Sequence, residues 1–291
     1  MKDIFRKIIK AFIPPIFYKR AIYSKAKILL LYEILRLKER KNRYQLFHDE
    51  LISQIKEIPE IKKFFPEDKM RGHYVYEPMR NTLKHPDLYI EQVRYYRMYD
   101  FFKKEYPEIF NSNTTILNAG DTDGILLEAL GKNRTSLNIN RECVEFIKKK
   151  GVEAVLGDAE NLEFENSSFD FVFCFQTLEH CPNPIKVLNE LGKVAKKKLF
   201  LSIPYTEQTN IYNINYWIDL KKSSWGEKEV KNVDCHIFEF SPEDFKNVLS
   251  YTNLEYEENF PIDYFNNDSF KGRLLNKIYP SYFNFFVLRP K

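Results

Sequence analysis

Glycine is scarce in this chain, and its few glycines are unevenly placed. Only 9 of the 291 residues are glycine, and five of these fall between positions 120 and 157. This excludes the glycine-rich fibrous and low-complexity classes of protein. Because glycine reaches backbone conformations that other residues avoid, the cluster indicates tight turns within one segment.

Paired cysteines and long apolar runs are also lacking. The four cysteines, Cys143, Cys174, Cys181 and Cys235, form no Cys-x-x-Cys pair. With no leader peptide evident, this pattern favours a reducing, cytoplasmic environment over a disulfide scaffold. The longest apolar stretch, around residues 28–31, is closely bounded by charged residues. It falls far short of the roughly 18 residues that span a bilayer, so we expect no membrane-spanning helix.

Charge is divided unevenly along the chain. Residues 1–43 hold 13 Lys and Arg against 3 Asp and Glu, a local charge of +10, and the remainder holds 32 against 38, or −6. Residues 1–13 place Ile4, Ile8 and Phe12 on one helical face and basic residues on the other, which is typical of a surface-seeking helix. One interpretation is that residues 1–43 bind an anionic membrane surface at the inner membrane face. The other is that these helices pack on the core with a solvated basic face.

From residue 115 onward, strand-like and helix-like segments alternate. The pattern predicts strands at 115–119, 135–139, 152–156, 169–175 and 198–203, helices at 124–130, 141–150 and 184–196, then a helix at 242–249 and strands at 254–260 and 282–288. Such alternation predicts an α/β fold whose parallel sheet is covered by helices on both faces.

Two parts of the chain follow from this pattern. We predict a mainly α-helical, basic N-terminal extension over residues 1–110 and an α/β domain over residues 111–291. The last helix of the extension, at about 87–104, is expected to dock on the core, although its Arg-Tyr run at 94–99 has a second interpretation, stacking on nucleic acid. Within the α/β domain, residues 205–235 are rich in Tyr, Asn and Trp. We expect them to form an insertion or lid on the acceptor side, that is, the side where a second ligand would bind.

Polar segments close several of the predicted strands. The sequence NAGDTDG at 118–124 closes the first strand, NI at 138–139 the second, GDAE at 157–160 the third and QTLEH at 176–180 the fourth. The carboxyl ends of parallel strands meet at one edge of a sheet, where open α/β sheets bind their ligands. The sequence therefore predicts a site for a nucleoside-containing cofactor at this edge.

The order of these segments resembles the class I S-adenosylmethionine-dependent methyltransferases, in particular their small-molecule, type 11-like branch. The resemblance covers roughly residues 112–260 and implies a Rossmann-like sheet of seven strands with S-adenosylmethionine as the cofactor. Gly120 and Gly124 then face its methionyl part, Asn138 its ribose and Asp158 its adenine. The full set of cofactor-binding residues that the resemblance implies is Asn118, Ala119, Gly120, Gly124, Asn138, Ile139, Asp158, Ala159, Phe175 and Gln176.

The chain departs from the family pattern at three positions. Asn118 and Asn138 stand where carboxylates are usual, and Thr122 stands where glycine is common. Losing a charged hydrogen-bond partner costs about 1 kcal/mol at each asparagine, which together weakens binding roughly thirtyfold. An alternative hypothesis is therefore a catalytically inactive binding protein on the same fold. Asp121 and Asp123 restore negative charge near the cofactor, or Asp123 caps the following helix.

His180 and His236 are the candidate catalytic residues. His180 follows the fourth strand at the ligand-binding edge, and a histidine suits removal of a proton from a hydroxyl acceptor. The alternative for His180 is a structural role in its loop. In a second interpretation, QTLEH at 176–180 with the distant His236 resembles the Glu-x-x-Glu-His arrangement of the RNA 3′-end 2′-O-methyltransferases, which implies that Glu179, His180 and His236 hold a divalent ion. Gln176 replaces the first glutamate of that arrangement, which leaves one charged ligand fewer. Our main expectation is that the protein holds no metal.

The leading hypothesis is a cytoplasmic O-methyltransferase that acts on a small or lipid-linked acceptor, namely a hydroxyl of a glycan or glycolipid. RNA methylation is an alternative because the first 43 residues are basic and the Arg-Tyr run mixes bases with aromatics. The net charge of −6 on the remainder argues against a nucleic-acid partner.

Overall fold

A computed structural model of the chain describes residues 59–64, 69–71, 74–76, 86–131, 133–211, 236–265, 270–278, 281 and 283–291. The predictions for the amphipathic start, for the rest of residues 1–58 and for most of the insertion at 205–235 lie outside these residues. No helix among the described residues has both the length and the apolar character that a bilayer span requires.

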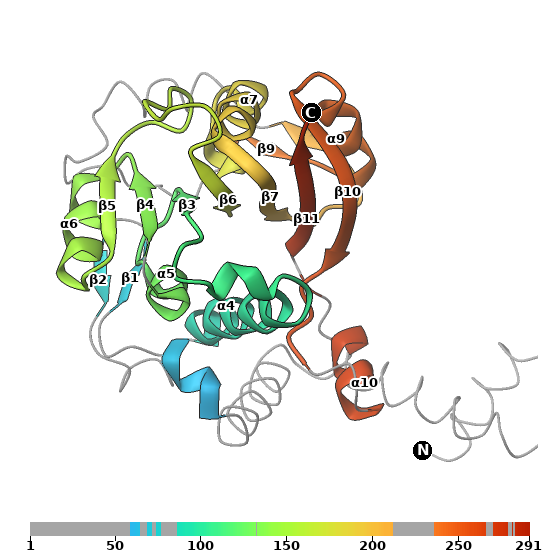
Figure 1. The fold of residues 1–291 in the computed structure, drawn as a ribbon. Coiled ribbons are helices and arrows are strands. Elements are labelled where there is room, and N and C mark those ends of the chain that lie inside the picture. Colours follow the sequence, from blue (N-terminus) through green and yellow to red (C-terminus); the bar gives the residue numbers. More distant parts are fainter. Residues whose placement is uncertain are drawn as a thin grey trace, which may run out of the picture.

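A seven-stranded mixed sheet forms the centre of the molecule (Figure 1). In spatial order the strands are β10 (Leu254–Pro261), β11 (Phe283–Pro290), β7 (Ala195–Pro204), β6 (Phe169–Phe175), β3 (Ile116–Ala119), β4 (Arg134–Asn138) and β5 (Glu153–Leu156). The five strands from β7 to β5 run parallel, and β11 lies antiparallel to both β7 and β10. The chain turns back between β5 and β6, so the strand order reverses beside β3, and ligands bind at such a point in open α/β sheets.

Helices cover both faces of the sheet, as the sequence predicts. Alternate residues of β6 point to opposite faces, with Phe171 and Phe173 on one and Val172 and Cys174 on the other. The first face packs against α4 (Pro86–Glu105), α5 (Ile125–Leu130) and α6 (Arg141–Lys149), and the second against α7 (Pro184–Val194) and α9 (Pro242–Leu249). Figure 1 shows α4 and α5 on one side of the sheet and α7 and α9 on the other.

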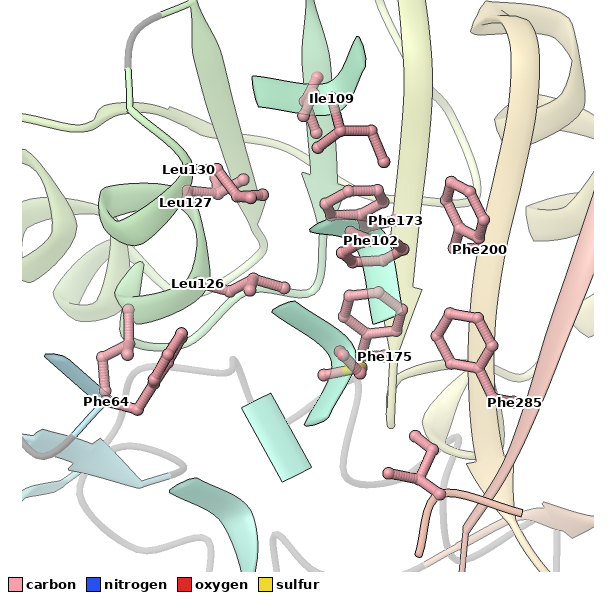
Figure 2. Close-up of a cluster of buried hydrophobic side chains, with 14 of the residues drawn as sticks. Phe64, Phe102, Ile109, Leu126, Leu127, Leu130, Phe173, Phe175, Phe200 and Phe285 are labelled. Carbon is pink, nitrogen blue, oxygen red and sulfur yellow. The ribbon is translucent and has the colours of Figure 1, made fainter. Parts of the chain in front are cut away.

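The predicted docking helix is confirmed as α4, and aromatic rings hold it on the sheet. The ring of Phe102 stacks on Phe173 with centroids 5.0 Å apart and an angle of 5° between the ring planes. Figure 2 shows these rings within a cluster that includes Phe200 and Phe285. Arg94, from the Arg-Tyr run, is 5% exposed, and its guanidinium lies 4.5 Å from the ring centroid of Phe283. This residue of the run therefore belongs to the core, which disfavours its use in stacking on nucleic acid.

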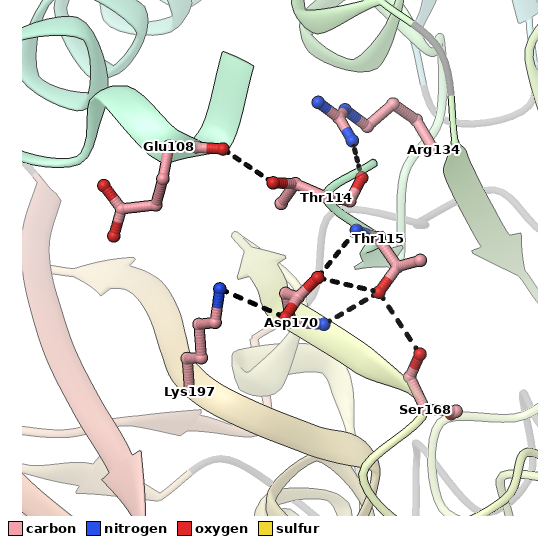
Figure 3. Close-up of polar contacts among 7 residues, drawn as sticks. All are labelled: Glu108, Thr114, Thr115, Arg134, Ser168, Asp170 and Lys197. Atoms are coloured by element: carbon pink, nitrogen blue, oxygen red, sulfur yellow. Dashed lines mark hydrogen bonds and ion pairs between the residues drawn. The ribbon is translucent and has the colours of Figure 1, made fainter. Parts of the chain in front are cut away.

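A polar network ties the amino ends of the central strands together (Figure 3). The carboxylate of Asp170 accepts a hydrogen bond from the Thr115 backbone N–H at 3.1 Å and pairs with Lys197 Nζ at 3.2 Å. The Thr115 hydroxyl accepts from the Asp170 backbone N–H at 2.9 Å. Arg134, which is buried, donates to the backbone oxygens of Thr114 and Ile109. This network lies at the opposite edge from the predicted site.

Several elements were not predicted from the sequence. A helix, α10 (Phe270–Ile278), separates β10 from β11, and its interior Gly272 disfavours a helix by about 1 kcal/mol relative to alanine. The part predicted as mainly helical contains a short hairpin, β1 (Lys69–Arg71) with β2 (Tyr74–Tyr76). Another pair joins β8 (Asn210–Ile211) to β9 (Phe238–Glu239). Strands of two or three residues are too short to show a hydrophobic period.

Candidate active site

The turn after β3 requires glycine at two positions. Gly120 and Gly124 have φ angles of +83° and +68°, in the left-handed region that favours glycine. A Cβ added at Gly120 would lie 2.1 Å from Oγ1 of Thr177, in the loop after β6. The missing side chain at Gly120 therefore lets the carboxyl ends of β3 and β6 approach each other closely.

Asp121 and Asp123 place buried negative charge in this turn. One carboxylate oxygen of Asp121 accepts from the Gly124 backbone N–H at 2.9 Å, and the other accepts no hydrogen bond within the described part of the chain. Burial and the charge of Asp123 raise the pKa of Asp121 to about 6, although its hydrogen bonds act to lower it. Asp123 accepts from the backbone N–H of Ile125, the first residue of α5, at 3.1 Å, but the N-cap of α5 is Gly124, so Asp123 precedes the capping position that the sequence assigned to it.

Asn138 and Asn118 are explained by the groups they meet. The side-chain amide of Asn138 donates to the backbone oxygen of Asp121 at 2.7 Å, and its oxygen accepts from the Asn140 backbone N–H at 2.8 Å. Asn118 hydrogen-bonds the Asp121 side chain and lowers its pKa. A carboxylate at either position could not donate to these acceptors. The negative charge that the family pattern places at the two strand ends is here carried by Asp121 and Asp123 in the turn.

Apolar side chains stand exposed at the ends of β4 and β5. Ile139 is 37% exposed and Leu156 is 43% exposed, and the register pairs Asn138 with Leu156. After β5, the carboxylate of Asp158 accepts from the Glu160 backbone N–H at 2.9 Å, and Ala159 is buried. The sequence did not indicate Leu156, because an apolar residue at the end of a predicted strand looks like part of the core.

The backbone at the end of β6 is strained. Gln176 has a φ of +53°, which is uncommon for a residue with a Cβ. Its backbone N–H donates to the Ser202 backbone oxygen at 2.9 Å, and its side-chain amide donates to the Ser202 hydroxyl at 3.3 Å. Residues held in such conformations are frequent at functional sites. The neighbouring Phe175 ring stacks 5.9 Å from Phe285, across the intervening β7.

His180 and His236 come together at the same edge of the sheet. His180 lies in the short helix η5 (Leu178–His180), and His236 lies two residues before β9. Their ring centroids are 5.0 Å apart with the planes at 74°. The backbone N–H of Ile237 donates to the Glu179 backbone oxygen at 2.7 Å and holds the two segments together.

Two glutamates accompany this histidine pair. Glu239 approaches Nδ1 of His236 at 2.6 Å, and the sequence did not predict this contact. Glu179 is 2% exposed, and neither of its carboxylate oxygens accepts a hydrogen bond from another described residue. Burial raises the pKa of Glu179 to about 8, against the opposing effects of its own backbone N–H and of the positive charge on Arg94.

A family model decides what kind of domain carries this site. Residues 117–203, which run from β3 to the end of β7, match the model described as a methyltransferase domain. The chain contains a class I S-adenosylmethionine-dependent methyltransferase domain. The family uses S-adenosylmethionine as its cofactor, and the resemblance seen in the sequence is confirmed.

Known proteins share shorter or more distant likenesses with this chain. An uncharacterized protein of Methanocaldococcus jannaschii is 28% identical over 64 residues, which is 22% of this chain and 31% of that protein. The biotin biosynthesis bifunctional protein of Cellvibrio japonicus is 32% identical over 89 residues, 28% of this chain and 18% of that protein. The chain thus aligns with less than a third of either relative.

One solved structure aligns with a larger share of the chain. Magnesium protoporphyrin IX methyltransferase from Synechocystis PCC 6803, solved with bound S-adenosylhomocysteine, is 12% identical and has a TM-score of 0.45. The match covers 79% of this chain and 93% of that one.

The residues at the strand ends fit the cofactor of the methyltransferase family. One buried oxygen of the Asp121 carboxylate accepts no hydrogen bond from the described residues. Its negative charge suits a ligand that carries a sulfonium and an ammonium group. Ile139 and Leu156 offer exposed apolar surface, which suits an adenine ring. Beside them, the Asp158 loop offers a carboxylate.

A cavity of about 160 Å³ lies further along the same edge of the seven-stranded sheet. Its walls come from α4, from the end of β10 and from β11, and they include Arg97, Phe101, Phe260, Asp263 and Phe285. It lies at the carboxyl edge because Phe283 of β11 pairs with Pro204 at the end of β7. Four phenylalanine rings, with Phe265 as the fourth, and two charged side chains give it the mixed character of a small-molecule site.

Proposed function

We propose that the methyltransferase transfers a methyl group to a hydroxyl oxygen of a small or lipid-linked acceptor, such as a glycan or glycolipid. The single observation that carries this proposal is the close pair of His180 and His236 beside the turn after β3. Hydroxyl acceptors must lose a proton during transfer, and histidine is the side chain whose pKa best suits that step near neutral pH.

The chain contributes binding, charge and proton acceptance. S-adenosylmethionine supplies the electrophilic methyl group, so no covalent enzyme nucleophile is needed. In this proposal the turn at Gly120 and Gly124 and the carboxylates of Asp121 and Asp123 hold the cationic end of the cofactor, and Ile139 meets its adenine. The remaining proposed cofactor contacts are Asn118, Ala119, Asn138, Asp158, Ala159, Phe175 and Gln176.

A carboxylate prepares one histidine for the proton. The contact between Glu239 and Nδ1 of His236 orients the ring and leaves Nε2 as the nitrogen available to accept a proton. A hydroxyl acceptor must lose its proton, and in this proposal His236 or the adjacent His180 accepts that proton.

The aromatic cavity is the proposed acceptor pocket. Phe101, Phe260 and Phe285 supply apolar faces that suit a sugar ring or an acyl chain, and Arg97 and Asp263 supply polar groups at the same wall. The choice of a lipid-linked acceptor rests on the basic residues 1–43 alone. Deleting residues 1–15 and following the protein between membrane and soluble fractions tests that choice, and unchanged partitioning would reject it.

Two measurements test the proposal. Calorimetric titration with S-adenosylhomocysteine should show saturable binding, and incubation with methyl-labelled S-adenosylmethionine and glycan or glycolipid fractions should yield O-methylated product by mass spectrometry. We expect His236→Gln to lower turnover at least tenfold without weakening cofactor binding, whereas Tyr251→Ser, on an exposed loop, should leave both unchanged. Product methylated on nitrogen or carbon would overturn hydroxyl transfer.

A further inference from the structure

The histidine pair belongs to a larger group of metal-ligating side chains. Glu179, His180 and His236 each offer one ligand atom, and these three atoms all lie within 4.8 Å of one another. Glu179 and His180 come from η5, whereas His236 comes from a segment more than fifty residues later. The backbone bond from Ile237 N–H to the Glu179 oxygen fixes one segment against the other.

The carboxylate of Glu179 lacks the partners that a buried acid needs. It is 2% exposed, and no other described residue donates a hydrogen bond to either oxygen. An uncompensated buried carboxylate is strongly unfavourable, which is why such groups are usually paired or bound to a metal. The positive charge of Arg94 acts on Glu179, yet the Arg94 guanidinium packs over the Phe283 ring and donates no hydrogen bond to the carboxylate.

Glu239 supports His236 in the way that outer carboxylates support metal ligands. Its Oε1 lies 2.6 Å from Nδ1 of His236, at the side of the ring opposite to Nε2. Histidines that bind metals nearly always donate their second ring N–H to a carboxylate, a backbone carbonyl or water. This contact leaves Nε2 of His236 as the nitrogen that faces an ion.

We propose that Glu179, His180 and His236 form a binding site for one divalent transition-metal ion, such as Zn²⁺, Mn²⁺ or Co²⁺. Two imidazoles and one carboxylate match the preferences of these ions better than those of Mg²⁺ or Ca²⁺, which take oxygen ligands. Zinc holds such ligands at about 2.0–2.2 Å, so ligand atoms that lie within 4.8 Å of one another need to come closer on binding, and the two histidines are only half-buried.

The position of the site gives the ion a role. Thr177, two residues before Glu179, contacts Gly120 in the turn proposed to hold the cofactor. Three protein ligands leave coordination positions open, and a divalent ion would lower the pKa of an acceptor hydroxyl bound there, so that its proton passes to solvent. The oxygen would then form its bond to the methyl group as the sulfur–methyl bond breaks and S-adenosylhomocysteine leaves. This inference rests on the proposed function and deepens it, because the ion then performs the hydroxyl activation otherwise given to a histidine. It replaces our expectation of no metal.

Cobalt binding to the full chain tests the site without any methyl transfer. The protein is stripped with a chelator, dialysed and titrated with Co²⁺, whose visible absorption reports nitrogen and carboxylate ligands. We expect one saturable site per chain, at least tenfold weaker binding in Glu179→Gln and in His236→Gln, and about tenfold weaker binding in Glu239→Gln. Glu128→Gln, which changes an exposed carboxylate on α5, is the matched control and should bind as the unaltered chain does.

The outcomes separate this inference from the proposed function. Circular dichroism checks that each variant is folded, and Glu179→Gln keeps the size of the side chain. Absence of saturable binding below millimolar Co²⁺, or equal binding by the unaltered chain and both ligand variants, would overturn the metal site. If S-adenosylhomocysteine still binds in that case, the methyl-transfer proposal stands. Metal binding without hydroxyl methylation would instead contradict the proposed function alone.

Discussion

Gly120 shows how one missing side chain shapes the site. Its φ of +83° costs a residue with a Cβ about 1–2 kcal/mol, and a Cβ there would overlap Thr177 at 2.1 Å. We predict that Gly120→Ala lowers the free energy of unfolding by about 2–4 kcal/mol, measured by urea denaturation. In Gly120→Ala/Thr177→Gly, compared with Thr177→Gly alone, the overlap is gone and about 1–2 kcal/mol should remain, whereas an alanine at 177 would keep a Cβ 2.7 Å away. Additive effects of the two substitutions would contradict the contact.

Asp121 makes stability depend on pH in mild acid. Its folded pKa of about 6 lies above its ordinary value, so its contribution is complete below about pH 4 and is lost as the pH rises toward 6. The isosteric, neutral variant Asp121→Asn escapes this loss. We predict that the free energy of unfolding of Asp121→Asn, relative to that of the unaltered chain, increases by about 2 kcal/mol from pH 4 to pH 6.5. Parallel pH profiles for the two proteins would refute the raised pKa.

Asp170 joins strands at the edge opposite to the site. Burial acts to raise its pKa, but the Thr115 N–H and the Lys197 ion pair outweigh burial and hold the pKa below its ordinary value. Its contribution is therefore present above about pH 4 and is lost as the pH falls through the depressed pKa. We predict that Asp170→Asn is less stable by about 1–2 kcal/mol at pH 7, with a smaller difference near pH 3. S-adenosylhomocysteine affinity should not change, and a weakened affinity would contradict this separation of the two edges.

The elements that could be predicted from the sequence are those with a long hydrophobic period. The strand at 169–175 and the helix at 242–249 match β6 and α9 in their bounds, and the other predicted strands and helices of the α/β domain differ by one to three residues at their ends. β8 and β9 have two residues each, which is too short for a hydrophobic period. They form through pairing between segments that are distant in the chain. The sequence likewise did not show that β11 runs antiparallel to β7, because strand direction depends on pairing between segments that are distant in the chain.

The candidate site could be predicted as a set of strand ends but not as a set of contacts. The resemblance to the family placed the turn, Asp158 and the histidines in order along the chain. It could not show that the Asn138 side chain donates a hydrogen bond to the turn, because this bond depends on the backbone oxygen of Asp121 lying 2.7 Å away. Nor could the sequence show the contact between Glu239 and His236, or the lack of partners for Glu179. These facts arise from tertiary packing, which no local pattern encodes.

Cofactor binding at one edge should stabilise the whole molecule by mass action. At a concentration one hundred times its Kd, a ligand that binds only the folded state adds about 2.7 kcal/mol, which corresponds to roughly 5–10 °C in the midpoint of thermal unfolding. We predict such a shift with S-adenosylhomocysteine, measured by calorimetry on the full chain. Ile139→Ser removes exposed apolar surface and should weaken binding roughly fivefold, with a smaller shift at equal ligand concentration.

The matched control is Tyr251→Ser, because Tyr251 is 77% exposed just before β10 and lies at the edge opposite to the site. Both substitutions remove exposed apolar surface, so neither should alter the stability of the ligand-free protein by more than about 0.5 kcal/mol. Only Ile139→Ser should reduce the shift produced by the ligand. An equal reduction in both variants would mean that the ligand does not lie against the end of β4. No shift at millimolar ligand would contradict cofactor binding by this chain.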